Sequence, residues 1–304
     1  MPVFGKLLLP LALVAVSACS SSQEFASDVP VIITTSAITN DLVKSIVGDY
    51  ANVVSIVPNA MDTHTYEPKS SQMRYLDLAD LVIFADKDLN PAIYQVAKIT
   101  LGPDALLDLN ASSLTVEDYV YRDPVANVGR NVHTWTDPTL TIKWLTPLYD
   151  RLSELIPEKS AHLLERTLVA EKELLELDRQ IAASVASIPV NVRKLMVYHD
   201  AWQYFGLRYG FTIVGALQAV DFSEPSPREL TAMSTQIRQE GVKVFFGSEV
   251  FSSDIMEVLE SESGARYVPD LADDRLPGEL GSAEHTYKEM MLRNINIIVK
   301  NLAG

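Results

Sequence analysis

Residues 157–189 read PEKSAHLLERTLVAEKELLELDRQIAASVASIP, and the architecture predicted for the 304-residue chain follows from them. Apolar side chains recur in this stretch at helical spacing, with charged side chains between them. The apolar positions are Leu163, Ala170, Leu174, Leu177, Ile181 and Val185. Because prolines bracket the stretch, we predict one helix of about 27 residues, ~40 Å long at 1.5 Å per residue, with a single buried face.

Strand and helix signals alternate on both sides of this helix. Before it, short apolar runs predict strands at 31–35, 53–57, 81–84 and 105–109, and Ser36 is placed to cap a helix over 37–50. After it, strands are expected at 194–198, 212–216, 242–246 and 265–268, followed by a last helix over 286–302. This alternation is typical of parallel sheets covered by helices on both faces. We therefore predict an α/β fold of two lobes, joined by one long rigid helix, with a ligand site in the cleft between them.

The predicted domain organisation has five parts. It consists of a lipoprotein signal peptide (1–18), a tether (19–30), an N-terminal α/β lobe (31–140), a helical connector that includes the long helix (141–188) and a C-terminal α/β lobe (189–304). The whole stretch from 141 to 187 is expected to be helical and to contain no strand.

The N-terminus carries a candidate export signal. Lys6 precedes an apolar run over 7–18 that is too short to cross a bilayer. The string Val-Ser-Ala over 16–18, followed by Cys19, resembles a bacterial lipobox. We predict that lipid on Cys19 anchors an extracytoplasmic protein to a bacterial membrane, at the cell surface or in the periplasm. The alternative is an ordinary signal peptide with an incidental cysteine.

Composition excludes other classes of function. The formal net charge is -15, so nucleic-acid binding, which needs clustered Lys and Arg, is not expected. The single cysteine excludes an intrachain disulfide.

Three of the five histidines occupy positions suited to a ligand site. His64 follows the strand at 53–57 and His199 follows the strand at 194–198, so each lies at the carboxyl end of a strand, where α/β sheets place ligands. His133 directly precedes the helical region. A neutral imidazole is a good ligand for zinc and other borderline metals. His162 and His285, at the starts of helices, are interpreted as structural or surface residues.

Five segments around these histidines and near the end of the chain contain distinctive strings, in order along nearly all of the mature chain. They are Asp62-Thr-His64-Thr-Tyr-Glu-Pro68, His133-Thr-Trp-Thr-Asp-Pro138, His199-Asp-Ala-Trp-Gln-Tyr-Phe205 with Tyr209-Gly210, Leu271-Ala-Asp-Asp274-Arg-Leu276, and Thr286-Tyr287 with Met290-Met291 and Asn294. Together these strings resemble motifs of the zinc and manganese solute-binding lipoproteins of bacterial ATP-driven (ABC) transporters.

The resemblance implies four metal ligands, two from each lobe: His64, His133, His199 and Asp274. The chain departs from the family's pattern at Thr63, where a proline is usual.

The carboxylate ligand has alternatives in the sequence. Asp273 is adjacent to Asp274, so the assignment can slip by one, although the spacing to Leu276 favours Asp274. Asp270 is a weaker candidate. Glu249, after the strand at 242–246, is interpreted as a supporting or structural residue.

Two sets of neighbours are expected to support the ligands. Aromatic side chains should pack a dry shell around the site: Tyr66, Trp135, Trp202 and Phe205. Carboxylates close in the chain are candidates to accept a proton from the second nitrogen of a ligand imidazole: Asp62, Asp137 and Asp200.

The resemblance implies a monomeric binding protein, not an enzyme, that captures a divalent transition metal and delivers it to a cognate ABC permease. Three imidazoles favour zinc, and the family's manganese members typically carry a glutamate in place of His199. Manganese is the next candidate metal, because the chain has an aspartate as a fourth candidate ligand and lacks the His-rich loop of many zinc members. The affinity for the metal is expected to fall below about pH 6, because only a neutral imidazole binds a metal and the reference pKa of histidine is ~6.5.

Three other functions fit the sequence less well. A zinc-dependent hydrolase needs an open coordination position, and the sequence contains neither His-Glu-x-x-His nor Gly-x-Ser-x-Gly. An adhesin-type surface lipoprotein would need a host target that no motif identifies. Capture of a larger chelate, such as a siderophore, would need a wide pocket with arginine or aromatic contacts.

Overall fold

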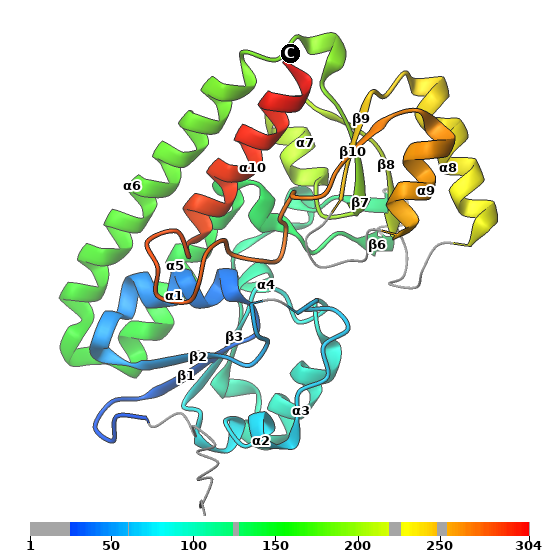
Figure 1. The fold of residues 1–304 in the computed structure, drawn as a ribbon. Coiled ribbons are helices and arrows are strands. Elements are labelled where there is room, and N and C mark those ends of the chain that lie inside the picture. Colours follow the sequence, from blue (N-terminus) through cyan, green and yellow to red (C-terminus); the bar gives the residue numbers. More distant parts are fainter. Residues whose placement is uncertain (1–24, 60, 124–127, 219–225, 248–253, 304) are drawn as a thin grey trace, which may run out of the picture.

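The computed structural model describes residues 25–59, 61–123, 128–218, 226–247 and 254–303. It confirms an α/β fold of two lobes, each built on a parallel sheet flanked by helices and joined by a long helix (Figure 1). The predicted signal peptide, Cys19 and Glu249 lie outside the described residues. Within the described residues, no helix is both long and apolar enough to cross a bilayer.

The N-terminal lobe contains a four-stranded parallel sheet of order β2-β1-β3-β4. Ser36 accepts a hydrogen bond from the backbone N–H of Thr39 and so caps the first helix, as predicted. The strands are β1 (Val31–Thr34), β2 (Asn52–Ser55), β3 (Leu81–Phe84) and β4 (Leu106–Asp108). The helices are α1 (Ala37–Val47), α2 (Ser70–Met73), α3 (Pro91–Leu101) and α4 (Leu109–Ser113).

The C-terminal lobe repeats this plan with a parallel sheet of order β10-β9-β7-β8. Its strands are β7 (Lys194–His199), β8 (Thr212–Gln218), β9 (Val244–Phe246) and β10 (Arg266–Val268). Its helices are α7 (Gln203–Tyr209), α8 (Pro227–Glu240), α9 (Asp254–Ser263) and α10 (Tyr287–Leu302).

The connector consists of two helices separated by a short 3-10 turn. Helix α5 (Pro138–Leu155) begins earlier than predicted because the Asp137 side chain accepts from the Thr139 N–H and Pro138 suits the first turn. The chain then leaves the helix at Ile156, because the residue before a proline disfavours the helical region. Helix α6 (Ser160–Val185) follows, with 26 residues.

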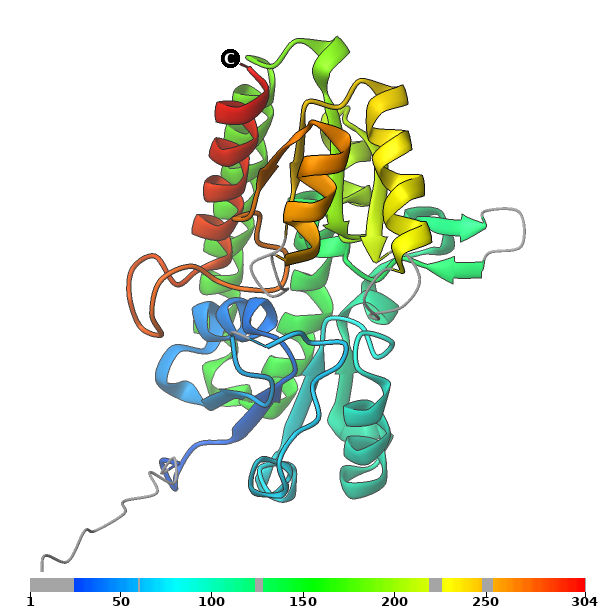
Figure 2. The same ribbon diagram turned by 45° about the vertical axis from the view of Figure 1, so that its right-hand side comes forward.

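Helix α6 is buried along the apolar stripe that the sequence predicts, since all six of its positions are less than 9% exposed. It packs against α1, α5 and α10, and therefore contacts elements of both lobes (Figures 1 and 2). Burying each leucine of such a stripe stabilises the fold by about 1.5–3 kcal/mol. A helix held along its length in this way limits the relative movement of the two sheets.

The two sheets separate the hydrophobic core into clusters, because successive side chains along a strand point to opposite faces of the sheet. In β1, Ile32 points into the central core shared with α6, whereas Ile33 points into a separate cluster on the other face of the sheet. In β7, Val197 joins the central core and Met196 joins a third cluster. Both sheets are therefore covered on both faces, as their nearly continuous apolar strands predict.

A short antiparallel hairpin, β5 (Tyr121–Asp123) and β6 (Val128–Arg130), was not predicted. Strands of three residues are too short to give a periodic signal. The hairpin emerges beside the junction of the lobes (Figure 2). The hydroxyl of Tyr204 on α7 donates to the Asn131 carbonyl at 2.7 Å and accepts from the Val120 N–H at 3.1 Å, which ties the base of the hairpin to the C-terminal lobe.

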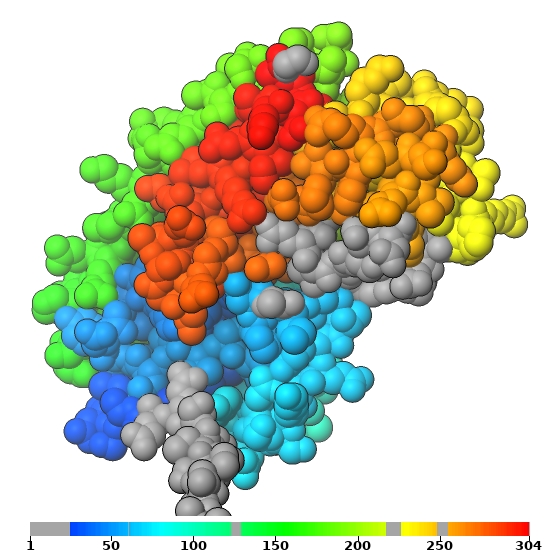
Figure 3. Space-filling view, viewed as in Figure 1, coloured from blue at the N-terminus to red at the C-terminus, as the bar shows by residue number. Residues whose placement is uncertain are grey.

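The segment between β10 and α10 reaches across to the N-terminal lobe. Figure 3 shows this segment, in orange, lying against the blue surface that includes α1. The backbone N–H of Tyr287 donates to Asp41 on α1 at 2.8 Å, and the Tyr287 hydroxyl donates to the backbone carbonyl of Trp135 at 2.5 Å. The lobes are thus in direct contact on this side of the molecule.

Candidate metal centre

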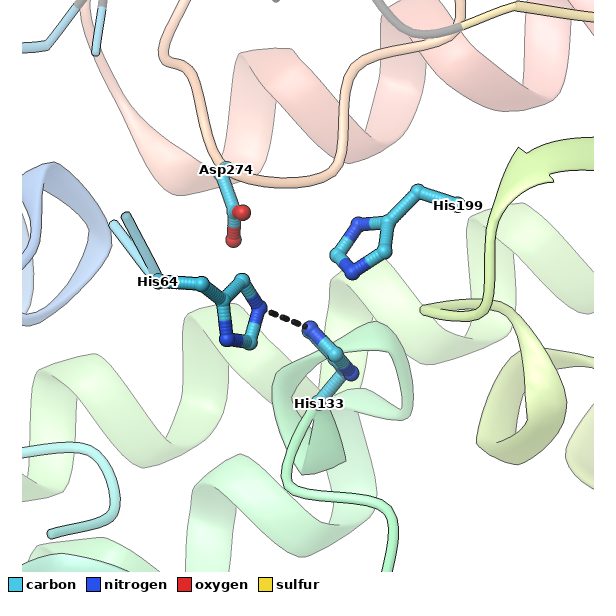
Figure 4. Close-up of side chains that lie close together, drawn as sticks. All are labelled: His64, His133, His199 and Asp274. Carbon is cyan, nitrogen blue, oxygen red and sulfur yellow. Dashed lines mark hydrogen bonds between the residues drawn. The ribbon is translucent and has the colours of Figure 1, made fainter. Parts of the chain in front are cut away.

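Four side chains from four separate segments converge at the junction of the lobes (Figure 4). His64 lies in the loop after β2, and His133 lies at the start of the turn before α5. His199 is the last residue of β7, and Asp274 lies in the loop after β10. One ligand atom of each lies within 4.8 Å of those of the other three. We refer to these residues as the four-residue group.

The spacing of the group suits a small metal ion. The Nε2 atoms of His64 and His133 are 2.9 Å apart, and the ring of His199 lies 4.5 Å from that of His133 and 5.2 Å from that of His64, measured between centroids. In a tetrahedral zinc site with Zn–N bonds of about 2.0–2.1 Å, donor atoms are about 3.3 Å apart. Small shifts of the side chains would therefore produce such a shell.

Each imidazole is oriented by a partner on its second nitrogen. His199 Nδ1 donates to the Asp273 carboxylate at 3.1 Å, and His133 Nδ1 donates to the side-chain oxygen of Asn131 at 2.9 Å. The remaining ring nitrogen of His64 bonds to the backbone of Leu89. All three partners are acceptors, so each ring, in its neutral form, carries its proton away from the group and directs a lone pair inward.

This arrangement has an electrostatic consequence for His64 and His133. Two nitrogen lone pairs that face each other at 2.9 Å repel unless a cation or a proton lies between them. A divalent metal satisfies both lone pairs and matches the chemistry of the other two members of the group, an imidazole and a carboxylate.

The orienting residues differ from those that the sequence suggested. Asp62 accepts from the backbone N–H of His64 and from Thr65, and so shapes the loop rather than the ring. Asp137 caps α5, and Asp200 accepts from Gln203. The hydrogen bonds of these three carboxylates go to backbone and side-chain groups other than the imidazole rings.

Asp273 and Asn131 carry out the roles that had been assigned to other residues. From the sequence, Asp273 is only an alternative ligand, although its position beside Asp274 is the available signal. Asn131 lies two residues before His133, close enough for its oxygen to accept from both the backbone and the ring of that histidine. No pattern in the sequence distinguishes it from the other asparagines.

The aromatic neighbours divide into two sets. Trp135 lies edge-on to His133 with ring centroids 5.1 Å apart, and Trp202 and Phe205 belong to the central core. Tyr66 differs from its expected role, because it packs on the cluster of the outer sheet face and donates its hydroxyl to Gln72.

The group lies in a nearly dry environment. His133, His199 and Asp274 are only 5%, 2% and 6% exposed, whereas His64 is half-buried. Burial strengthens electrostatic attraction to a cation, and it leaves the side of His64 as the direction from which solvent reaches the group.

Burial and neighbouring charges shift the pKa values of the group in opposite directions. Burial, with the nearby His199, lowers the pKa of His64 and of His133 well below 6.5. Burial also lowers the pKa of His199, but the Asp273 carboxylate outweighs it and raises that pKa to about 9. Burial, followed by the charge of Asp273, raises the pKa of Asp274 to about 8. Without a metal, the group therefore holds protons at neutral pH on His199 and Asp274.

The other candidates from the sequence lie apart from the group. Asp270 is exposed and is not a member of it. His162 is exposed and lies edge-on to Tyr50, and His285 bonds to the Pro277 carbonyl.

Comparison with known proteins agrees with this geometry. Residues 32–301 match the family model described as zinc-uptake complex component A, periplasmic. The chain belongs to this family. The match spans both lobes and includes all members of the four-residue group.

Curated relatives of the family cover most of the chain. The zinc-binding protein TroA of Treponema pallidum is 25% identical over 295 residues, which are 94% of this chain and 93% of the relative. The manganese-binding lipoprotein MntA of Halalkalibacterium halodurans is 24% identical over 273 residues, 90% of this chain and 88% of the relative. The solved structure of the periplasmic zinc-binding protein TroA from Treponema pallidum has the same fold, with a TM-score of 0.84, 24% identity, and coverage of 91% of this chain and 100% of that one.

Proposed function

We propose that this protein captures a divalent transition metal outside the cytoplasmic membrane and delivers it to an ABC-type permease. The observation that carries the proposal is the convergence of three imidazoles and a carboxylate, with the second nitrogen of every imidazole held by an acceptor. Relatives named as zinc- and manganese-binding proteins support the same assignment.

The proposed ligands are His64, His133, His199 and Asp274. Each lobe supplies two of them, so the metal joins the lobes and its loss is coupled to their relative movement. Because α6 packs against both lobes, this movement is small. We propose that docking on the permease shifts the ligand geometry and releases the metal, and that the protein acts as a monomer.

A binding role is favoured over a zinc hydrolase by the composition of the group. A catalytic zinc keeps one coordination position open for water or substrate. Four protein ligands on a tetrahedral ion would close the shell. Capture of a large chelate is disfavoured as well, because the ring centroids of the three imidazoles lie within 5.2 Å of one another and leave room for only a bare ion.

Zinc is the favoured metal and manganese is the next candidate. Imidazole suits zinc, while manganese prefers more oxygen donors. Affinity alone does not identify the physiological metal, since zinc binds more tightly than manganese at most such sites. We expect a deletion strain grown under metal limitation to be rescued by added zinc and not by added manganese. Rescue by manganese alone would reassign the metal, even if the purified protein carried zinc.

We also propose that Cys19 becomes the lipidated N-terminus of the mature protein. Relatives described as lipoproteins support this anchor. Stable anchoring requires more than one acyl chain, so a Cys19→Ser variant should move from the membrane fraction to the soluble fraction. Fractionation followed by immunoblotting checks this expectation. A Cys19→Ser variant that stays with the membrane would show that the anchor lies elsewhere.

A further inference from the structure

The loop that carries Asp274 is bound directly by a side chain of the opposite lobe. Asn59, in the segment between β2 and His64, donates its Nδ2 to the Leu276 carbonyl at 2.9 Å. Its Oδ1 accepts from the Leu276 N–H at 2.7 Å. One side-chain amide thus pairs with both backbone groups of a residue two positions after Asp274, and it connects the His64 loop with the Asp274 loop.

Two further side chains hold the same loop. Asn294 on α10 makes a similar two-bond pair with the backbone of Ala272, at 2.6 and 2.9 Å. The indole N–H of Trp135 donates to the Asp273 carbonyl at 2.8 Å. The bond from Asn294 lies within the C-terminal lobe, so it survives when the lobes separate. Trp135 and Asn59 precede α6 in the chain, so their bonds reach the loop from the N-terminal lobe.

Asn59 differs from Trp135 and Asn294 in its exposure. Trp135 and Asn294 are 1% and 0% exposed, whereas Asn59 is half-buried. Water can therefore replace the bonds of Asn59 one at a time as the lobes begin to part. Breaking the Trp135 bond instead leaves a buried donor without a partner until the lobes have opened further.

We propose that Asn59 is a latch that keeps the two lobes closed over the metal and limits the rate at which the metal leaves. This inference rests on the proposed function for its consequence, metal retention. Asn59 is not a member of the four-residue group, so it is a positioning residue that acts on Asp274 through the backbone of Leu276. Only an amide side chain presents a donor and an acceptor side by side to match a backbone N–H and C=O.

The chain contains a matched control. Asn52, at the start of β2, also pairs its amide with both backbone groups of one residue: it accepts from the Ala26 N–H at 3.1 Å and donates to the Ala26 carbonyl at 2.9 Å, with a longer bond of 3.5 Å to the Val29 carbonyl. It lies in the same lobe and makes the same two kinds of bond, but it connects two segments of that lobe. Asn52→Ala therefore removes an equivalent pair without affecting the contact between the lobes.

The test compares zinc dissociation from the wild-type protein, Asn59→Ala and Asn52→Ala, measured by mixing each zinc-loaded protein with excess chelator. Loss of two hydrogen bonds should accelerate dissociation from Asn59→Ala by about tenfold or more, with little change in the association rate. Asn52→Ala should dissociate within about twofold of the wild-type rate. Equal rates for Asn59→Ala and wild type, or equal acceleration by both variants, would overturn the latch.

A second measurement does not need the metal. In the metal-free protein, hydrogen exchange of the Leu276 amide should be faster in Asn59→Ala than in wild type, while Asn52→Ala leaves it unchanged. An unchanged Leu276 amide in Asn59→Ala would reject the latch whatever the metal does. A wild-type protein that binds neither zinc nor manganese would instead reject the proposed function, and hydrogen exchange would still show whether Asn59 closes the lobes.

Discussion

Replacing His133 with alanine should abolish tight zinc binding while leaving the metal-free fold intact. A closed four-ligand zinc site contributes about 10–16 kcal/mol of binding free energy, so one ligand accounts for about 3–4 kcal/mol, or a few hundred- to a thousandfold in affinity. His133 is a better choice than His199 because removal of His199 would leave the buried carboxylate of Asp273 without its bond to the imidazole, at a cost of several kcal/mol in stability.

Two measurements check this expectation. Competition with a chelator of known affinity gives the loss in zinc affinity. Thermal unfolding with and without zinc should show a rise in melting temperature for the wild-type protein and little or none for His133→Ala, because a ligand stabilises the folded state only to the extent that it binds. His162→Ala is the matched control, since His162 is an exposed histidine outside the four-residue group. If His133→Ala kept its zinc-induced stabilisation, His133 would not be a ligand.

The affinity for zinc should keep rising as the pH increases from about 7 to about 9. Zinc requires a neutral imidazole and an ionised carboxylate. His199 has a pKa raised to about 9 and Asp274 a pKa raised to about 8, so both hold a proton in the metal-free protein at pH 7. Each proton that the metal must displace lowers the affinity for zinc about tenfold for every pH unit below the pKa of the group that carries it. This window lies above the one expected from the reference pKa of histidine, which placed the decline below about pH 6.

Calorimetry in buffers of different ionisation enthalpy measures the protons released on zinc binding, and we expect between one and two at pH 7. The Asp273→Asn variant supplies the control. It removes the charge that raises the pKa of both His199 and Asp274, so the rise in affinity between pH 7 and pH 9 should become flatter. At pH 9 its affinity should be about 10–100-fold lower than that of wild type, because an orienting carboxylate is lost. A wild-type affinity that is constant above pH 7 would contradict this account.

Many features of the fold follow from local patterns along the chain. The stripe from Leu163 to Val185 predicts α6 because helical spacing repeats over about six turns, and such a long repeat leaves little ambiguity. The eight strands of the two sheets also correspond to the predicted apolar runs. Patterns of three residues, such as β5 and β6, do not carry this information, and the hairpin was missed.

The candidate site was partly accessible to the same reasoning. His64 and His199 were singled out because they follow strands, and the carboxyl ends of parallel strands lie at one edge of a sheet. The motif around His133 placed it in the same family pattern. The structure brings these three histidines together with Asp274, whose ligand role rested on a resemblance and a spacing.

Sequence periodicity therefore specified the two sheets and the long helix, because these depend on spacing along one element, whereas the resemblance of short motifs singled out the four-residue group. Tertiary structure alone decided that Asp273 and Asn131 orient the imidazoles, that His199 and Asp274 hold protons at neutral pH, and that Asn59 pairs with Leu276. Asn59 and Leu276 are 217 positions apart in the chain. Such contacts depend on how packed elements direct their side chains, and burial then sets the protonation of the groups they enclose.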